Sequence, residues 1–264
     1  MELIVNRLSF KCALLLGVVG VGFALTLSIP AVFSADTKAA YTHAEAGLNF
    51  YKKAKLAEAA NEFRQATLLD PGNASYHKNL SAILLCLGKV QDALKEAKMA
   101  VRLSPGKETY HMNLANVYVA MKNYAGAEAA YRSALKLNGS DKACLKNLSA
   151  CLMQLNKKKE AAQILTNYLS KHPHEADVLT ELANLQLEEK DYKQAEKTAR
   201  QAIKEDPSNA DSHLVLAHIL KNTHKDNESL AEFKTVLKLD PKHQGADAIK
   251  KVIDFLERRP DSRI

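Results

Sequence analysis

The sequence contains no tryptophan, and glycine, proline and cysteine are scarce, with ten, seven and four copies in 264 residues. So little glycine and proline excludes a collagen-like chain and disfavours a disordered one. Aromatic residues make up only 6% of the chain, and few other strand-forming residues accompany them. Alanine, leucine and lysine, which favour helices, dominate the middle instead. With 47% hydrophobic residues available for a core, an all-helical globular protein is expected.

Motifs of catalysis are also missing from the sequence. There is no glycine-rich phosphate loop, no H-E-x-x-H and no G-x-S-x-G motif, so we expect neither an enzyme nor a bound cofactor. The net charge of +7 comes mostly from lysines interleaved with acidic residues. That pattern is typical of a solvated helical surface, and we expect no nucleic-acid partner.

Residues 1–35 have the pattern of a signal peptide or an N-terminal signal anchor. Arg7 and Lys11 precede an uncharged stretch over residues 12–35. As a helix this stretch is long enough to cross the ~30 Å hydrocarbon core of a bilayer, so it could be cleaved or could remain as an anchor. The positive flank stays in the cytoplasm, and both outcomes place the chain after Asp36 on the far side of the membrane.

A repeat of 34 residues runs through most of the remaining chain. Turn residues recur at multiples of this spacing, with Gly139 in place of one proline: Pro71, Pro105, Pro173, Pro207 and Pro241. Placing them at position 32 of the repeat gives six units, at residues 40–73, 74–107, 108–141, 142–175, 176–209 and 210–243. Alanine is frequent at positions 20 and 27, and a small residue occupies position 8. Small side chains let two antiparallel helices approach closely, and proline ends the second helix.

This register resembles the tetratricopeptide-repeat family over residues 40–243. The resemblance implies an all-α, right-handed superhelical solenoid of six helix-turn-helix repeats. One departure is Ser229, which replaces the alanine of position 20 in the sixth repeat. The last hairpin needs a cover, and residues 244–264 are expected to form a capping helix and tail. The apolar residues at helical spacing there are Ala248, Ile249, Val252, Ile253 and Phe255.

Asparagines recur on the face that would bind a partner. In a stacked array of this family, the first helix of each repeat lines the concave groove. Position 6 is asparagine in three successive repeats, at Asn79, Asn113 and Asn147, and position 9 adds Asn116 and Asn184. An amide offers one acceptor and two donors, so it can pair with both N–H and C=O of an extended peptide. The row resembles the asparagine ladder of peptide-binding family members. Alternatively, these are ordinary polar residues on a solvated helix.

Charged residues complete the predicted groove. Repeats two and four are net positive and place Lys78 and Lys146 at position 5, whereas repeat five is net negative and contributes Asp177 and Glu181. A partner with an acidic stretch would be attracted to the basic middle of the array. The predicted peptide-binding set is Lys78, Asn79, Asn113, Asn116, Lys146, Asn147, Asp177, Glu181 and Asn184.

Four histidines share position 4, at His43, His77, His111 and His213. Successive hairpins would hold them on the order of 10 Å apart, too far to share a metal ion. We therefore expect no metal site, and interpret these rings as packing residues near the helix interface.

The function that these features favour is a protein–protein interaction adaptor that binds an extended segment of another protein in the groove. The alternative is a structural or assembly subunit of a bacterial envelope complex that docks through its convex face. Asn79 and Asn147 lie in N-x-S sequons, where a glycan would block the groove, so bacterial export fits better than a glycosylating pathway. We expect export across the bacterial inner membrane to the periplasmic or extracellular side, with membrane attachment through residues 12–35 if they are not cleaved.

Overall fold

The structure, a computed structural model, describes residues 35–258. Within that range the chain forms thirteen α-helices and no strand, which confirms the all-α helical-repeat class. In chain order the helices are α2 Ala35–Lys52, α3 Leu56–Leu69, α4 Ala74–Cys86, α5 Val90–Leu103, α6 Glu108–Ala120, α7 Tyr124–Leu137, α8 Lys142–Gln154, α9 Lys158–Leu169, α10 Ala176–Glu188, α11 Tyr192–Glu205, α12 Ala210–Asn222, α13 Asp226–Leu239 and α14 Ala246–Glu257. None of these helices is both long and apolar enough to cross a bilayer. The predicted export segment lies outside the described residues, apart from Ala35.

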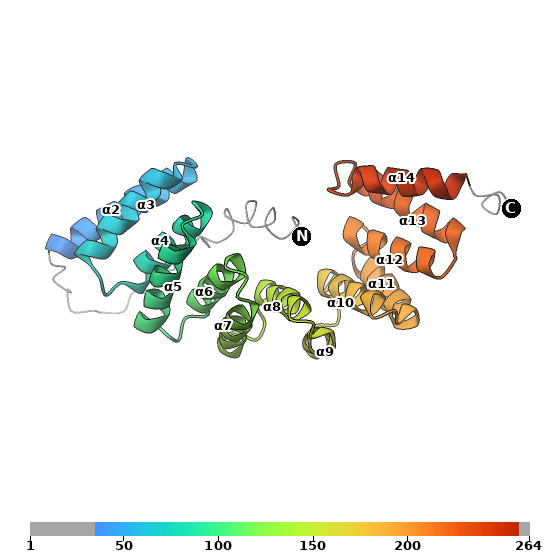
Figure 1. Ribbon diagram of the computed structural model, residues 1–264, viewed down its shortest axis with the longest axis horizontal. Coiled ribbons are helices and arrows are strands. Elements are labelled where there is room, and N and C mark those ends of the chain that lie inside the picture. Colours follow the sequence, from blue (N-terminus) through green and yellow to red (C-terminus); the bar gives the residue numbers. More distant parts are fainter. Residues whose placement is uncertain (1–34, 259–264) are drawn as a thin grey trace. The chain divides into compact units, whose positions relative to one another are not determined.

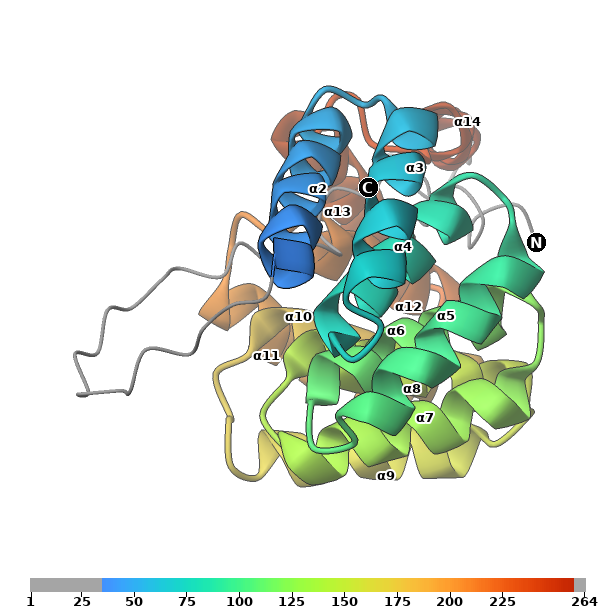
Figure 2. The same ribbon diagram turned by 90° about the vertical axis from the view of Figure 1, so that its left-hand side faces the viewer.

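The chain divides into two compact units, residues 1–144 and 145–264. In the first unit, α2 pairs with α3, α4 with α5 and α6 with α7, and each pair packs on the next through α3 with α4 and α5 with α6 (Figures 1 and 2). In the second unit, α10 pairs with α11 and α12 with α13. There α9 packs on α10, α11 packs on α12, and α14 packs on α13.

Several helix boundaries have a local cause. The side chains of Asn73 and Asn209 cap α4 and α12 by accepting hydrogen bonds from Ser75 N at 3.2 Å and Ser212 N at 3.1 Å. At the other end, the residue before four of the prolines is the C-cap and leaves the helical conformation; Asp70, before Pro71, has φ −136° and ψ 78°.

The turn inside each hairpin contains one residue with positive φ. These residues follow the same 34-residue spacing, at position 15, and only one is glycine: Ala54, Gly88, Lys122, Asn156, Lys190 and His224. A single left-handed residue reverses the chain after the first helix of each hairpin. Its recurrence shows that the backbone follows the repeat even where the side chains differ.

The core confirms the role of small residues where two helices cross. Ala59, Ala93 and Ala127, all at position 20, are fully buried, and aromatic rings fill the space beside such positions. Phe63 and Phe233 have no exposed surface, and Tyr131 is 2% exposed. Close packing of this kind, together with clusters of larger apolar side chains such as Leu80, Ile83 and Leu84, stabilises the helical repeat.

Serine takes the place of alanine at three helix crossings, and at two of them it adds a hydrogen bond; the third, Ser149, has no partner for its buried Oγ among the described residues. In the second repeat Ser81, at position 8, donates its hydroxyl to the carbonyl of Ala93 at position 20, over 2.9 Å. In the sixth repeat the roles are exchanged, and Ser229 at position 20 donates to Ala217 at position 8, also over 2.9 Å. Ser229 departs from the alanine of position 20, but it keeps the same hydrogen bond between the two helices, with the hydroxyl supplied by the opposite helix.

Helix α14 covers the last hairpin, with two differences from the expected packing, because Ala248 and Phe255 are both exposed. Its buried stripe is Ile249, Ile253 and Leu256, which joins a core cluster with Phe233 and Val236. Phe255, expected on the inner face, is 50% exposed. The spacing of four and then three residues from Ile249 defines one helical face, and Phe255 lies outside it.

Candidate peptide-binding faces

The first unit places four of the predicted binding residues on neighbouring helices. Lys78 and Asn79 lie on α4 and are half-buried, while Asn113 and Asn116 lie on α6 and are buried, with 1% and 9% of their surface exposed. Helices α4 and α6 are in contact with each other. The sequence suggested exposed amides along a groove, and the structure places the two α6 amides beneath the surface.

The amide of Asn113 is buried without hydrogen bonds. Neither its Nδ2 nor its Oδ1 has a partner among the described residues. A buried polar group without a partner costs about 1–3 kcal/mol, and native proteins normally satisfy such groups with protein or water. Asn113 is therefore a local cost to stability, and another molecule could offset that cost only if the atoms covering this amide move aside.

Two other amides of this face already accept a hydrogen bond within the protein. The hydroxyl of Tyr131 on α7 donates to Oδ1 of Asn116, inside the hairpin. The Lys78 ammonium donates to Oδ1 of Asn79 over 3.4 Å. In both cases the amide oxygen accepts an internal hydrogen bond, so the NH₂ group is the one left to meet an acceptor such as a peptide carbonyl.

The Lys78 ammonium lies in a partly dehydrated environment. Burial lowers the pKa of Lys78 below its ordinary value. A charge held away from water interacts more strongly with a partner carboxylate than a fully solvated lysine does. Lys78 is thus better suited to attract an acidic segment than its surface neighbours.

The second unit holds the other predicted residues on α8 and α10. Lys146 Nζ of α8 lies 3.6 Å from Asp177 Oδ2 of α10, so two of the predicted binding residues pair with each other. Asn147, on α8, and Glu181 and Asn184, on α10, are half-buried. Two of the charged residues that the sequence suggested would attract a partner therefore form an ion pair between α8 and α10 instead. Asn147 belongs to this unit and not to the unit that holds Asn79 and Asn113.

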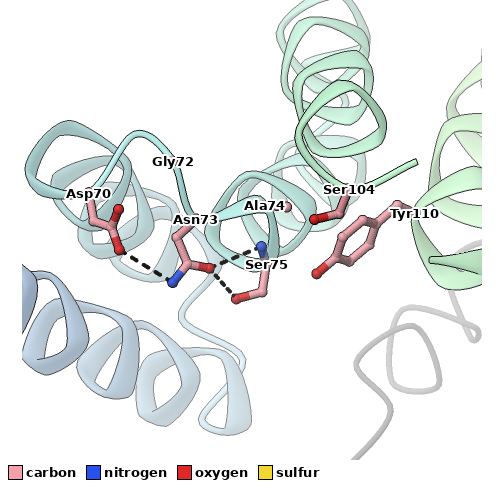
Figure 3. A pocket seen from close by; sticks show the side chains of 7 residues that line it. All are labelled: Asp70, Gly72, Asn73, Ala74, Ser75, Ser104 and Tyr110. Atoms are coloured by element: carbon pink, nitrogen blue, oxygen red, sulfur yellow. Dashed lines mark hydrogen bonds between the residues drawn. The ribbon is translucent and has the colours of Figure 1, made fainter. Parts of the chain in front are cut away.

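An open polar depression of about 550 Å³ lies at the loop edge of the first unit, outside the predicted set (Figure 3). It is lined by Asp70, Gly72, Asn73, Ala74, Ser75, Ser104 and Tyr110. Asn73 Oδ1 accepts hydrogen bonds from the backbone N–H and hydroxyl of Ser75, and Asn73 Nδ2 donates to Asp70 over 3.4 Å. Much of its polar lining therefore serves to cap α4.

The position-4 histidines make contacts that sequence reasoning missed. His43, His77 and His213 each bind a glutamate nineteen residues later in the same hairpin, over 2.7, 2.6 and 2.6 Å. The signal was present, because a glutamate follows at that distance in these three repeats whereas alanine follows His111. Among the described residues no group of histidine, cysteine and acidic side chains is arranged to hold a metal ion.

The two cysteines of α8 are buried. Burial, with smaller effects from Asp141 and Glu108, raises the pKa of the Cys144 thiol to about 12. Its Sγ donates a weak hydrogen bond to the Tyr131 carbonyl over 3.5 Å. Such a thiol is protonated at neutral pH and is a packing residue, not a nucleophile.

Two sequence profiles described as tetratricopeptide repeat match the chain. One matches residues 118–185, 159–201 and 186–252, and the other matches residues 45–108. Among curated proteins none matches the sequence.

Solved structures of helical-repeat proteins resemble this one in fold. The Pseudomonas aeruginosa protein pilF is 18% identical, with a TM-score of 0.64 over 83% of this chain and 99% of its own. YrrB, described as a TPR protein with an unusual peptide-binding site, is 19% identical, with a TM-score of 0.54 over 73% of this chain and 99% of its own. A tetratricopeptide repeat protein from Parabacteroides merdae is 16% identical, with a TM-score of 0.59 over 83% of this chain and 84% of its own.

Proposed function

Because this chain belongs to the tetratricopeptide-repeat family, we propose that it is a protein-interaction adaptor that binds an extended segment of another protein along α4 and α6. The observation that carries the proposal is the Asn113 amide, which is buried and whose two polar atoms have no partner within residues 35–258. An extended peptide offers alternating N–H and C=O groups, and it could satisfy both atoms at once if the atoms that cover Asn113 move aside on binding. YrrB, whose fold is similar, is described as having a peptide-binding site, which supports the same use here.

The chemistry of the face favours a particular kind of segment. The side-chain oxygens of Asn79 and Asn116 each accept one internal hydrogen bond, and their NH₂ groups can donate to carbonyl groups of the partner. Lys78, dehydrated by burial, favours an acidic side chain nearby. A polypeptide read mainly through its backbone, with an acidic residue close to Lys78, fits these groups. No step of this function requires catalysis or a cofactor.

The proposal is tested by removing the two amides of the first unit. The N79A/N113A variant should capture markedly less partner from an envelope extract than the wild type, and a peptide from the captured partner should bind it at least about tenfold more weakly. The matched control is N61A/N227A, which removes two exposed asparagines from α3 and α13. Equal capture by wild type and N79A/N113A, with circular dichroism showing intact helices, would contradict peptide binding at this face.

We further propose that the adaptor works on the far side of a bacterial inner membrane, released or anchored by residues 12–35. This rests on the basic flank and the uncharged stretch of the sequence. Protease added to spheroplasts should digest the repeats while the membrane is intact, and the mass of the mature protein should reveal whether residues 1–35 have been removed. Full protection from protease until the cells are lysed would refute export.

A further inference from the structure

The imidazole of His77 lies between two oxygen acceptors in the first unit. Its Nδ1 is 2.6 Å from Oε2 of Glu96 on α5, and its Nε2 is 3.1 Å from the carbonyl oxygen of Pro71 in the loop before α4. The His77 side chain is only 8% exposed. One ring therefore connects three elements: helix α4, which carries it, helix α5 and the loop that joins the first hairpin to the second.

The same arrangement occurs in the second unit. Nδ1 of His213 on α12 is 2.6 Å from Oε2 of Glu232 on α13, and its Nε2 is 3.0 Å from the carbonyl oxygen of Pro207. Its side chain is 10% exposed. Both histidines occupy position 4, both glutamates position 23 and both prolines position 32 of the preceding repeat, so the sequence specifies the arrangement twice.

Two other repeats hold only half of the arrangement. His43 reaches Glu62 over 2.7 Å, but residue 37 is threonine where the proline would be, and the His43 side chain is 38% exposed. His111 reaches the Pro105 carbonyl over 2.8 Å, but Ala130 stands where the glutamate would be. Each of these two sites therefore holds one of the two contacts.

Two acceptors require two donors. A neutral imidazole has one N–H, and only the doubly protonated ring can donate from both nitrogens. We propose that His77 and His213 form proton-dependent histidine bridges, each of which ties its hairpin to the preceding loop when protonated and releases one of its two contacts when the proton leaves. The inference goes beyond the proposed binding function and needs no ligand for its test.

The charges around His77 agree with this assignment. Glu96 is the carboxylate in contact with the ring, and Arg102, also on α5, is the nearby positive charge. The hydrogen bond to Glu96 raises the pKa of His77; burial and Arg102 oppose it, and the Pro71 carbonyl adds to it. The net direction is upward from the ordinary 6.5. The stabilisation is therefore fully present below the unfolded-state pKa and is lost as the pH rises through the folded-state pKa. Around His213 the contacting groups are the Glu232 carboxylate on α13 and the Pro207 carbonyl.

Hydrogen exchange on the full-length protein tests the bridges directly. Amide protection at residues 70–76 and 206–212, corrected for the intrinsic pH dependence of exchange, should fall roughly tenfold between about pH 6 and about pH 8.5, as expected when a hydrogen bond to a charged group is lost. Among the described residues His111 contacts no carboxylate, so the loop beside it, at residues 104–110, should not show this fall.

The E96Q and E232Q variants provide a crossed control. A glutamine can turn its NH₂ group toward Nδ1, so a neutral ring satisfies both contacts and the pH dependence disappears. E96Q should flatten the profile at residues 70–76 and leave residues 206–212 unchanged, and E232Q should do the reverse. Conversely, A130E should create a pH-dependent fall beside His111. Flat profiles in the wild type, or a fall that persists at residues 70–76 in E96Q, would overturn the proposal.

Discussion

The ring of Phe63 fills the space beside Gly47, and a Cβ atom added to Gly47 would lie 2.8 Å from two carbons of that ring. Phe63 has no exposed surface, so the ring cannot turn away into solvent. At the scale of single residues, the crossing of α2 and α3 thus depends on the missing side chain at Gly47 and not on its backbone freedom.

We expect G47A to lower the free energy of unfolding by roughly 1 kcal/mol. Alanine gains about 1 kcal/mol of helix propensity, but overpacking a closed core costs typically about 1–3 kcal/mol. Urea unfolding followed by circular dichroism measures the difference. The control is G106A, because nothing lies within 4 Å of a Cβ built there. A G47A protein as stable as G106A would show that Phe63 has room to move.

The sequence predicted which helices carry the candidate site, but it did not predict the contacts of the individual side chains. The periodic asparagines identified the helices that carry the candidate face, because position in the repeat fixes the side of the helix. The sequence did not show that Asn116 bonds Tyr131, or that Lys146 pairs with Asp177. These contacts depend on the separation and tilt of neighbouring helices, which a position in the repeat does not specify. The roles of the nine predicted residues in binding remain predictions.

Helices α11 and α13 are linked by a network of charges. Glu196 on α11 lies 3.0 Å from Lys225 Nζ, just before α13, and 2.9 Å from Arg200, which also reaches Glu228 of α13 over 2.7 Å. Burial acts to raise the pKa of Glu196, but the hydrogen bonds from Lys225 and Arg200 outweigh it and lower the pKa below the ordinary 4.5. The carboxylate is therefore stabilised in the folded chain.

E196Q should destabilise the protein by about 0.5–1 kcal/mol near neutral pH, as is usual for a partly exposed network. Because the pKa of Glu196 is lower in the folded state, its contribution is present above the unfolded-state pKa and is lost as the pH falls through the folded-state pKa. Unfolding midpoints of wild type and E196Q should therefore converge in acid, and also in about 1 M salt. E189Q, which removes an exposed glutamate on α10's C-terminal side, is the control. A constant difference at all pH values would exclude an ionic cause.

The turns within the hairpins show a limit of prediction at this scale. The prolines between repeats gave the ends of the second helices, because proline cannot continue a helix. The left-handed residue inside each hairpin is glycine only at Gly88. A sequence signal for left-handed backbone relies on glycine or asparagine, so the four sites with alanine, lysine or histidine carry none. Packing of the paired helices imposes the conformation at those sites.

For the molecule as a whole, the repeat determined the fold class, because each hairpin presents a face that only a neighbour can cover. The same logic predicted a terminal cover, and α14 supplies it in the second unit. The division into units of residues 1–144 and 145–264 had no counterpart in the sequence, where the 34-residue frame continues without interruption.

The cap should stabilise the second unit through a narrow set of contacts. Leu256 is 1% exposed and lies in the cluster that includes Phe233. The L256A variant should lower the free energy of unfolding by about 2–5 kcal/mol and should aggregate more readily, because the substitution uncovers that cluster. Phe255 lies beside Leu256 on the same helix and is 50% exposed, so F255A should cost much less. Urea unfolding and light scattering compare the two variants. Equal losses would mean that α14 does not cover the hairpin as described.

The exchanged serines of the second and sixth repeats have a consequence for protein engineering. A consensus repeat, derived one position at a time, would have alanine at both position 8 and position 20, because alanine is the most frequent residue at each position. In the second and sixth repeats either helix supplies the hydroxyl to the other's carbonyl, whereas the hydroxyl of Ser149, at position 8 of the fourth repeat, has no partner among the described residues. An idealised array built from single-column averages would therefore lose a buried bond that a pairwise description of the repeat retains.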